Sequence, residues 1–120
     1  MRALVVDDSS TMRAVLRIIL RRKAFEVHEA KNGAEAMRTL EAIGPVDLML
    51  LDWNMPEMNG FELLSCIRRD SRHTNTKIMM VTTETALDEM SRALEAGANE
   101  YIMKPFTPDA VDDKLRMLGW

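Results

Sequence analysis

The sequence is poor in the residues that form disulfide frameworks and zinc sites, since its 120 residues include one cysteine and two histidines. The single cysteine, Cys66, excludes an internal disulfide and is typical of a reducing compartment. Its place in a helical pattern predicts a small buried residue rather than a nucleophile. His28 and His73 lie in different predicted elements without metal-ligand spacing, so neither is expected to bind zinc.

Long apolar runs are also missing, because none approaches the roughly 20 residues that a membrane-spanning helix needs. The first residues enter a strand-like pattern directly, without the charged and apolar regions of a signal peptide. The sequence contains no linker, repeat or low-complexity tract. We therefore expect one cytoplasmic domain over residues 1–120, with no membrane contact and no separate output domain.

Basic residues are scarce in the last third of the chain. Residues 1–83 contain 12 basic and 11 acidic residues, whereas residues 84–120 contain 4 basic and 8 acidic residues, a net charge of −4. Such a segment is poorly suited to a phosphate backbone, which argues against nucleic-acid binding. Aromatic residues make up only 5% of the chain, but 47% of it is hydrophobic and 11 methionines help to fill a core.

Strand-like apolar runs alternate with helical patterns along the whole chain. Strands are predicted at residues 2–7, 25–30, 46–51, 77–82 and 99–103. Helices are predicted after the hydroxyl caps at 9–11 and through residue 22, at 32–43, at about 60–69, through residues 87–94 to a stop at Gly97, and from Pro108 onward, with a loop at 70–76. This alternation predicts a three-layer α/β sandwich with a five-stranded parallel sheet and five helices.

The first predicted helix has an apolar side and a basic side. Five apolar residues recur at helical spacing, namely Met12, Val15, Leu16, Ile19 and Leu20. Four arginines lie mostly on the other side: Arg13, Arg17, Arg21 and Arg22. We interpret this row as a solvated helix face rather than a nucleic-acid site.

Charged or hydroxyl side chains stand where four of the predicted strands end. The central apolar run, residues 46–51, leads into Asp52, and Pro56 and Gly60 prevent a strand or helix from continuing. The other three ends carry Asp7 and Asp8, Thr82, and Lys104. Because the carboxyl ends of strands in a doubly wound sheet share one edge, we expect these side chains to converge there. Each could be a turn residue alone, but four together indicate a site.

Three converging carboxylates repel one another unless cations lie between them. A hard divalent ion with oxygen ligands meets this need, and Mg2+ suits few carboxylates, several waters and a phosphate. Three aspartates, one lysine and one divalent ion sum to zero formal charge. Such a site is suited to an incoming phosphoryl group, which a carboxylate can capture as an acyl phosphate.

Four segments carry a resemblance to a known family. They are Val-Val-Asp-Asp-Ser-Ser at 5–10, Asp-Trp-Asn-Met-Pro-Glu-Met-Asn-Gly at 52–60, Met-Val-Thr-Thr-Glu at 80–84 and Tyr-Ile-Met-Lys-Pro-Phe at 101–106. In this order and spacing they resemble a response-regulator receiver domain, over the whole chain, and in particular the stand-alone chemotaxis regulators of the CheY type. The resemblance implies a flavodoxin-like fold with strand order 2-1-3-4-5.

The resemblance also implies residue roles. Asp52 would accept a phosphoryl group from a phosphohistidine on a sensor histidine kinase. Mg2+, or Mn2+ as a substitute, would be held by Asp8, Asp52 and the backbone carbonyl of Asn54, with Asp7 acting through water. Lys104 would contact the phosphoryl oxygens, and its bond to the following proline is expected to be cis.

By the same resemblance, Thr82 and Tyr101 would form a switch, and Asn54 and Glu84 would tune hydrolysis. The switch would alter a face made by the fourth helix, fifth strand and fifth helix, about residues 85–118, which binds a target. The expected partners are the kinase, a target such as the flagellar motor switch, and a phosphatase. The protein is expected to be a monomer and a switch rather than a turnover enzyme.

Two positions depart from the family pattern. Thr83 stands where alanine or glycine is usual, and its bulk is expected to slow phosphorylation by small donors. Asn59 replaces a common aspartate before Gly60, and it is expected to serve equally well as a helix cap.

Two other functions remain open on the sequence. One is a relay intermediate, or a regulator unrelated to motility, that passes its phosphoryl group to a histidine phosphotransfer protein. The other is a phosphatase of the haloacid-dehalogenase type. Those enzymes carry a second aspartate two residues after the nucleophile as general acid, whereas Asn54 at that position cannot donate a proton.

Overall fold

A parallel β-sheet forms the centre of the molecule in the computed structural model, which describes residues 1–83 and 87–120. The strand order is β2-β1-β3-β4-β5, and every pairing is parallel. The predicted topology is therefore confirmed. Within the described residues the strands are β1 (Arg2–Val6), β2 (Glu26–Ala30), β3 (Leu48–Asp52), β4 (Lys77–Thr82) and β5 (Glu100–Met103).

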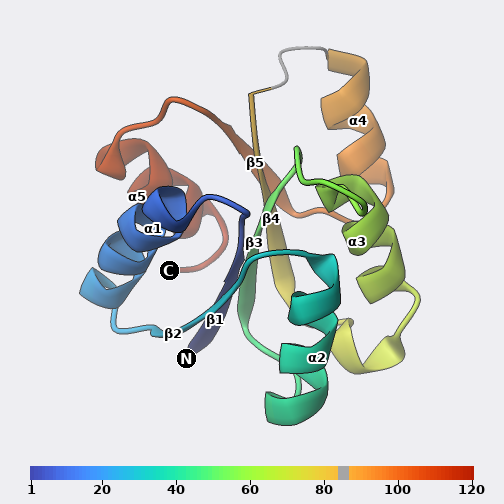
Figure 1. Ribbon diagram of the computed structural model, residues 1–120. Helices are drawn as coiled ribbons and strands as arrows, with labels where there is room; N and C mark the ends of the chain where they lie inside the picture. Colours follow the sequence, from blue (N-terminus) through green and yellow to red (C-terminus); the bar gives the residue numbers. More distant parts are fainter. Residues whose placement is uncertain (84–86) are drawn as a thin grey trace.

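Helices cover both faces of the sheet and complete the predicted three layers. In Figure 1, α1 and α5 lie on one side, and α2, α3 and α4 lie on the other. Among the described residues, no helix is long and apolar enough to cross a membrane. The bounds are α1 (Ser10–Arg22), α2 (Gly33–Ile43), α3 (Gly60–Arg68), α4 (Leu87–Glu95) and α5 (Pro108–Met117), with a short 3₁₀ helix, η1 (Ser71–His73), in the segment predicted as a loop.

The central strands are buried on both faces, which explains their unbroken apolar sequences. Alternate side chains point to opposite sides of the sheet. On β1, Leu4 and Val6 face the core beneath α2, α3 and α4, whereas Ala3 and Val5 face the core beneath α1 and α5. Every residue of β3 is buried, Asp52 included. The sheet therefore delivers this carboxylate to the edge from a rigid strand.

Side-chain caps begin four of the described α-helices, and those of α1, α2 and α3 are caps that the sequence predicts. Asn32 accepts a hydrogen bond from the backbone N–H of Glu35 at the start of α2. At α3, Asn59 and Glu62 bond reciprocally to each other's backbone N–H in a capping box. The asparagine before Gly60 is thus a fully functional cap, as expected. Ser9 and Thr107 cap α1 and α5 in the same manner.

Two expectations for the helices were wrong, and one residue on the apolar side of α1, Val15, is 39% exposed. Arg13 and Arg17 do not belong to a solvated face, since both bind the carboxylate of Glu29 on β2. Cys66 is half-buried on α3 rather than enclosed in the core.

Arg68, at the end of α3, ties together the segments that precede β4 and β5. Its guanidinium donates hydrogen bonds to the carbonyls of Gly97, His73 and Thr76 at 2.7–2.9 Å. It also donates to the side-chain oxygen of Asn99 at 2.9 Å. Burial lowers the pKa of Arg68. These bonds satisfy chain carbonyls at the end of the sheet opposite the carboxyl ends of the strands.

Candidate functional site

Asp7 and Asp8 follow β1 directly but have different surroundings. Asp7 is buried, at 1% exposure, and its Oδ1 accepts a hydrogen bond from the backbone N–H of Ser9 at 2.8 Å. Asp8 is exposed, and its carboxylate makes no hydrogen bond or ion pair with any described residue. The structure therefore provides one firmly held carboxylate and one that is free to bind a ligand.

Asp52 is the last residue of β3, and its side chain is 5% exposed. The chain turns back so closely after it that a Cβ on Gly60 would lie 2.3 Å from the backbone oxygen of Asp52. The N–H of Gly60 also donates to the carbonyl of Trp53 at 2.9 Å. Glycine at position 60 is required by this close approach rather than by an unusual backbone angle.

Lys104 reaches both buried aspartates from the end of β5. Its Nζ lies 3.1 Å from Oδ1 of Asp52 and 3.2 Å from Oδ2 of Asp7. The backbone N–H of Lys104 donates to the carbonyl of Thr82, which fixes its position beside β4. The peptide bond to Pro105 is cis, as expected.

The electrostatics of the site are those of crowded carboxylates with too few cations. Asp7, Asp8 and Asp52 each offer a carboxylate oxygen, and these oxygens lie within 4.8 Å of one another. Burial, and next the charge of Asp7, raise the pKa of Asp52 to about 6, although Lys104 and the backbone N–H of Asn54 oppose the rise. Burial lowers the pKa of Lys104, but its bonds to the two aspartates outweigh this and raise it overall. One lysine does not balance three carboxylates.

This donor set fits a hard divalent cation. Carboxylate oxygens are the ligands that Mg2+ prefers, and the exposed carboxylate of Asp8 is not bonded to any described residue. Asp7 already accepts bonds from Ser9 and Lys104. It is therefore less available for direct coordination than Asp8 is.

Thr82 and Thr83 bring hydroxyl groups to the same edge. Thr82 ends β4 and is 2% exposed, and its strand neighbour Val81 pairs with Asp52 in the sheet register. Thr83 is exposed, and its hydroxyl accepts a hydrogen bond from the side-chain amide of Asn54 at 3.2 Å. This bond joins the segment after β3 to the segment after β4 at the opening of the site.

Comparison with known families decides what kind of domain this is. The family model described as "Response regulator receiver domain" matches residues 3–116. The chain belongs to the response regulator receiver family. The receiver fold and its acidic edge agree with the expectations drawn from the four sequence segments.

Similar receivers come from bacterial chemotaxis. The chain is 47% identical to the chemotaxis protein CheY1 of Helicobacter pylori over 119 residues, which cover 98% of this chain and 96% of that one. It is also 47% identical to the chemotaxis protein CheY homolog of Campylobacter jejuni over 116 residues, 96% of this chain and 89% of that one. A crystal structure of the chemotaxis protein CheY4 of Vibrio cholerae superposes with a TM-score of 0.89 at 33% identity, covering 97% and 96% of the two chains. The receiver is therefore of the CheY type.

Two further residues implied by the resemblance have different outcomes. Tyr101 lies on β5 of the receiver and is half-buried, with Nζ of Lys114 at 4.8 Å from its ring centre. Lys114 also bonds Glu100 at 3.1 Å, so it connects α5 to β5. Glu84 lies outside the described residues, and its expected part in tuning hydrolysis stays a prediction.

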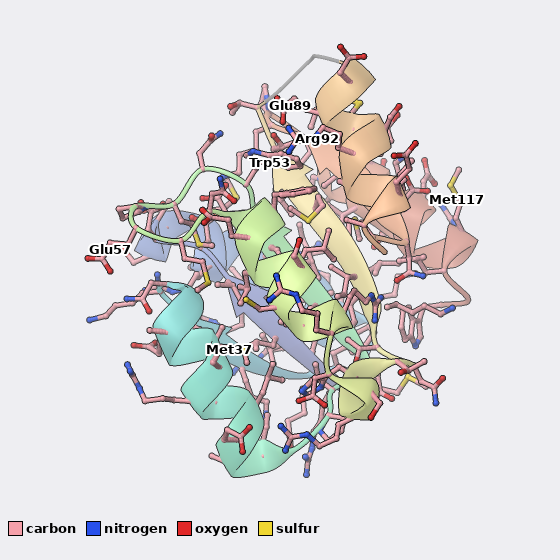
Figure 2. All side chains as sticks on the ribbon, turned by 90° about the vertical axis from the view of Figure 1, so that its right-hand side faces the viewer. Met37, Trp53, Glu57, Glu89, Arg92 and Met117 are labelled. Atoms are coloured by element: carbon pink, nitrogen blue, oxygen red, sulfur yellow. The ribbon has the colours of Figure 1, made fainter. Side chains whose placement is uncertain are left out.

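Sequence reasoning missed three contacts next to the site. Trp53 packs against Phe61, with ring centroids 5.6 Å apart, and the guanidinium of Arg92 lies 4.7 Å from the centre of the Phe61 ring. Figure 2 labels Trp53 and Arg92 on this side of the receiver. Arg13 bonds the main chain of Asp7. None of these contacts has a signal in the sequence, because each depends on how side chains from different segments are directed in the folded chain.

Proposed function

We propose that this receiver accepts a phosphoryl group on Asp52 from the phosphohistidine of a sensor histidine kinase, within a two-component pathway of chemotaxis. The observation that carries the proposal is the convergence of three carboxylates within 4.8 Å, with Lys104 at 3.1 Å from Asp52. The names of the similar chemotaxis proteins support the pathway. Asp52 is the proposed acceptor, and its place at the end of the middle strand of the sheet supports this choice.

In the proposed transfer, a carboxylate oxygen of Asp52 attacks phosphorus. The new O–P bond forms while the P–N bond to the histidine breaks, and the electron pair of that bond stays on the imidazole, which takes up a proton. Asp52 must be ionised to react, so its pKa of about 6 leaves it competent at neutral pH. A bound divalent ion supplies positive charge to the phosphoryl oxygens.

The ion would be held by the carboxylates of Asp8 and Asp52 and by the backbone carbonyl of Asn54, with Asp7 acting through water. The free carboxylate of Asp8 supports this assignment, and so does the occupation of Asp7 by Ser9 and Lys104. Mn2+ would substitute for Mg2+, because both accept oxygen ligands.

Lys104 and Thr82 would respond to the phosphoryl group once it is attached. Phosphorylation replaces a charge of −1 at Asp52 by about −2. Lys104 already contacts Asp52 and needs only a small movement to reach a phosphoryl oxygen. Thr82 would donate its hydroxyl to another oxygen, and Tyr101 would turn inward as the threonine moves.

The surface changed by this switch would be α4, β5 and α5, which we propose binds the downstream target. Residues 84–120 have a net charge of −4, so a basic or apolar partner site fits it best. A segment of the flagellar motor switch is the proposed partner. Charge reversal at four exposed or half-buried acidic positions should weaken binding to such a peptide, and unchanged affinity would disprove the surface assignment; the positions are Asp88, Glu89, Asp112 and Asp113.

The proposal makes this protein a switch that reacts once per phosphoryl group rather than a turnover enzyme. Asn54 and Glu84 would set the lifetime of the acyl phosphate. Asn54 is the better supported of the two, since it is exposed beside Asp52 and bonded to Thr83.

The decisive experiment treats the protein with acetyl phosphate or phosphoramidate in the presence of Mg2+. We expect an adduct of one phosphoryl group that is labile to base and to hydroxylamine, as an acyl phosphate is. Asp52→Asn should abolish it, whereas Asp47→Asn, which changes a carboxylate at the other end of β3, should leave it intact. An adduct that survives Asp52→Asn would refute the assignment, and sustained hydrolysis of a phosphate ester would favour an enzyme.

A further inference from the structure

The loop between β1 and α1 carries two of the three clustered aspartates, and Asp7 is fixed in it by every polar group it has. Its backbone N–H donates to the carbonyl of Ala30 at 3.1 Å, and its carboxylate accepts bonds from Ser9 and Lys104. Its backbone carbonyl accepts a bond from Nη1 of Arg13 at 2.6 Å. The bond from Arg13 is unexpected, because its side chain belongs to a helix face that the sequence predicts to be solvated.

Arg13 links this carbonyl to the edge strand of the sheet. Its Nε donates to Oε1 of Glu29 on β2 at 3.2 Å, while Nη1 reaches Asp7. The other carboxylate oxygen of Glu29, Oε2, accepts a hydrogen bond from Nη1 of Arg17 at 2.7 Å. The side chain of Arg13 is only 18% exposed, and that of Glu29 is 28% exposed. The guanidinium is thus oriented by a partly buried ion pair, and its Nη1 is directed at the loop.

We infer that Arg13 is a positioning residue for the divalent-cation site, acting through the carbonyl of Asp7 on the carboxylate of Asp8. The carbonyl of Asp7 belongs to the peptide group that leads into Asp8, so fixing it fixes the direction in which Asp8 leaves the strand. Asp8 has no side-chain partner among the described residues, so its orientation depends on its backbone. The inference rests on the proposed function, because it requires that the acidic cluster binds a cation.

Charge alone predicts the opposite effect, which makes the inference testable. Removing a positive charge near three carboxylates should tighten the binding of a cation. Removing a bond that orients a ligand should weaken it, and partners that orient metal ligands are commonly worth about 10- to 100-fold in affinity. Since Arg13 acts one peptide group away from Asp8, we expect a loss of about 3- to 10-fold.

Arg17 provides a matched control. It lies one helical turn further along α1 and bonds the same carboxylate of Glu29, yet it has no bond to the loop. Arg17→Met removes the same charge and one bond to Glu29, and it leaves the bond between Arg13 and Asp7 in place. Arg13→Met removes both contacts of its guanidinium.

The experiment measures the dissociation constant of Mn2+ by electron paramagnetic resonance of the free ion. Arg13→Met should raise the constant about 3- to 10-fold, and Arg17→Met should leave it within about twofold or lower it. Urea unfolding in EDTA shows that both variants are folded. Equal constants for the two variants would overturn the inference, and so would tighter binding by Arg13→Met.

A double-mutant cycle with Asp8 provides a second measurement that a purely structural role would not affect. If Arg13 acts by orienting Asp8, Arg13→Met should have little further effect on Mn2+ binding in an Asp8→Asn background. An unchanged loss in that background would overturn the inference. If the unsubstituted protein binds no Mn2+, the proposed cation site fails; if it binds and the two arginine variants are alike, only the role of Arg13 fails.

Discussion

Replacing Asp52 by asparagine should stabilise the metal-free protein, and the gain should appear only as pH rises. Asp52 is a charged group in a buried position beside Asp7, so its ionisation in the folded state is unfavourable. Asparagine has a similar shape and stays neutral at every pH. The variant therefore removes the burial of a charge while keeping most of the packing at the end of β3.

The size of the effect follows from the pKa of Asp52. The ordinary value is 3.8, and the folded protein raises it to about 6, so the folded state binds this proton more tightly than the unfolded state does. This stabilisation is complete below about pH 4 and is lost as pH rises through about 6. Each pKa unit is worth about 1.4 kcal/mol, so the asparagine variant should gain about 3 kcal/mol relative to the unsubstituted protein across this range.

The assay is urea unfolding in EDTA, followed by far-ultraviolet circular dichroism, at pH values between about 4 and 7.5. The difference in unfolding free energy between Asp52→Asn and the unsubstituted protein should grow across this range. Asp109→Asn, which removes an exposed carboxylate, is the control for the loss of one negative charge. In a parallel series without EDTA, saturating Mg2+ should stabilise the unsubstituted protein more than the variant, because the variant lacks the proposed ligand Asp52.

A difference that stays constant within about 0.5 kcal/mol from pH 4 to 7.5 would refute the reasoning. It would mean that Lys104 and the backbone N–H of Asn54 already offset the burial of Asp52 and the charge of Asp7. In that case the site would be balanced without a cation, and the electrostatic argument for metal binding would lose its basis.

Three further predictions test the surroundings of Asp52. Thr83→Ala should speed phosphorylation by acetyl phosphate by about 3-fold, since it removes the bond to Asn54 at the opening; an unchanged rate by stopped-flow fluorescence would contradict this. Gly60→Ala should lower the free energy of unfolding, measured in urea, by about 3 kcal/mol, because the new Cβ would lie 2.3 Å from the carbonyl oxygen of Asp52. Alanine in place of glycine normally stabilises a helix, so the expected sign is the reverse of the usual one. Lys104→Met should raise the pKa of Asp52 above about 6 in a carbon-13 NMR titration, and a lower midpoint would show that the lysine does not favour the carboxylate.

The sequence was sufficient for the fold because its local signals agree with one another. A strand such as β3, buried on both faces, is unbroken in apolar residues, and its burial could be expected directly. Caps such as Asn32 and Asn59 mark helix starts within a residue. The parallel order then gathers the strand ends, so the meeting of Asp52 with Lys104 could be expected as well.

Contacts that depend on exact side-chain direction could not be predicted. The row of arginines on α1 has the spacing of a solvated face, and only the structure shows that Glu29, on another element, draws Arg13 and Arg17 inward. The bond from Asn54 to Thr83 likewise depends on how two loops meet. The resemblance supplied a role for Tyr101, but its half-buried position is a structural result.

The four bonds of Arg68 have a mechanical consequence for signalling. They join the end of α3 to the segments that precede β4 and β5, so this end of the sheet resists deformation. If phosphorylation acts at the opposite rim, as proposed, we expect the anchored end to move least. The change of surface would then be concentrated in the parts of the receiver that follow the strands.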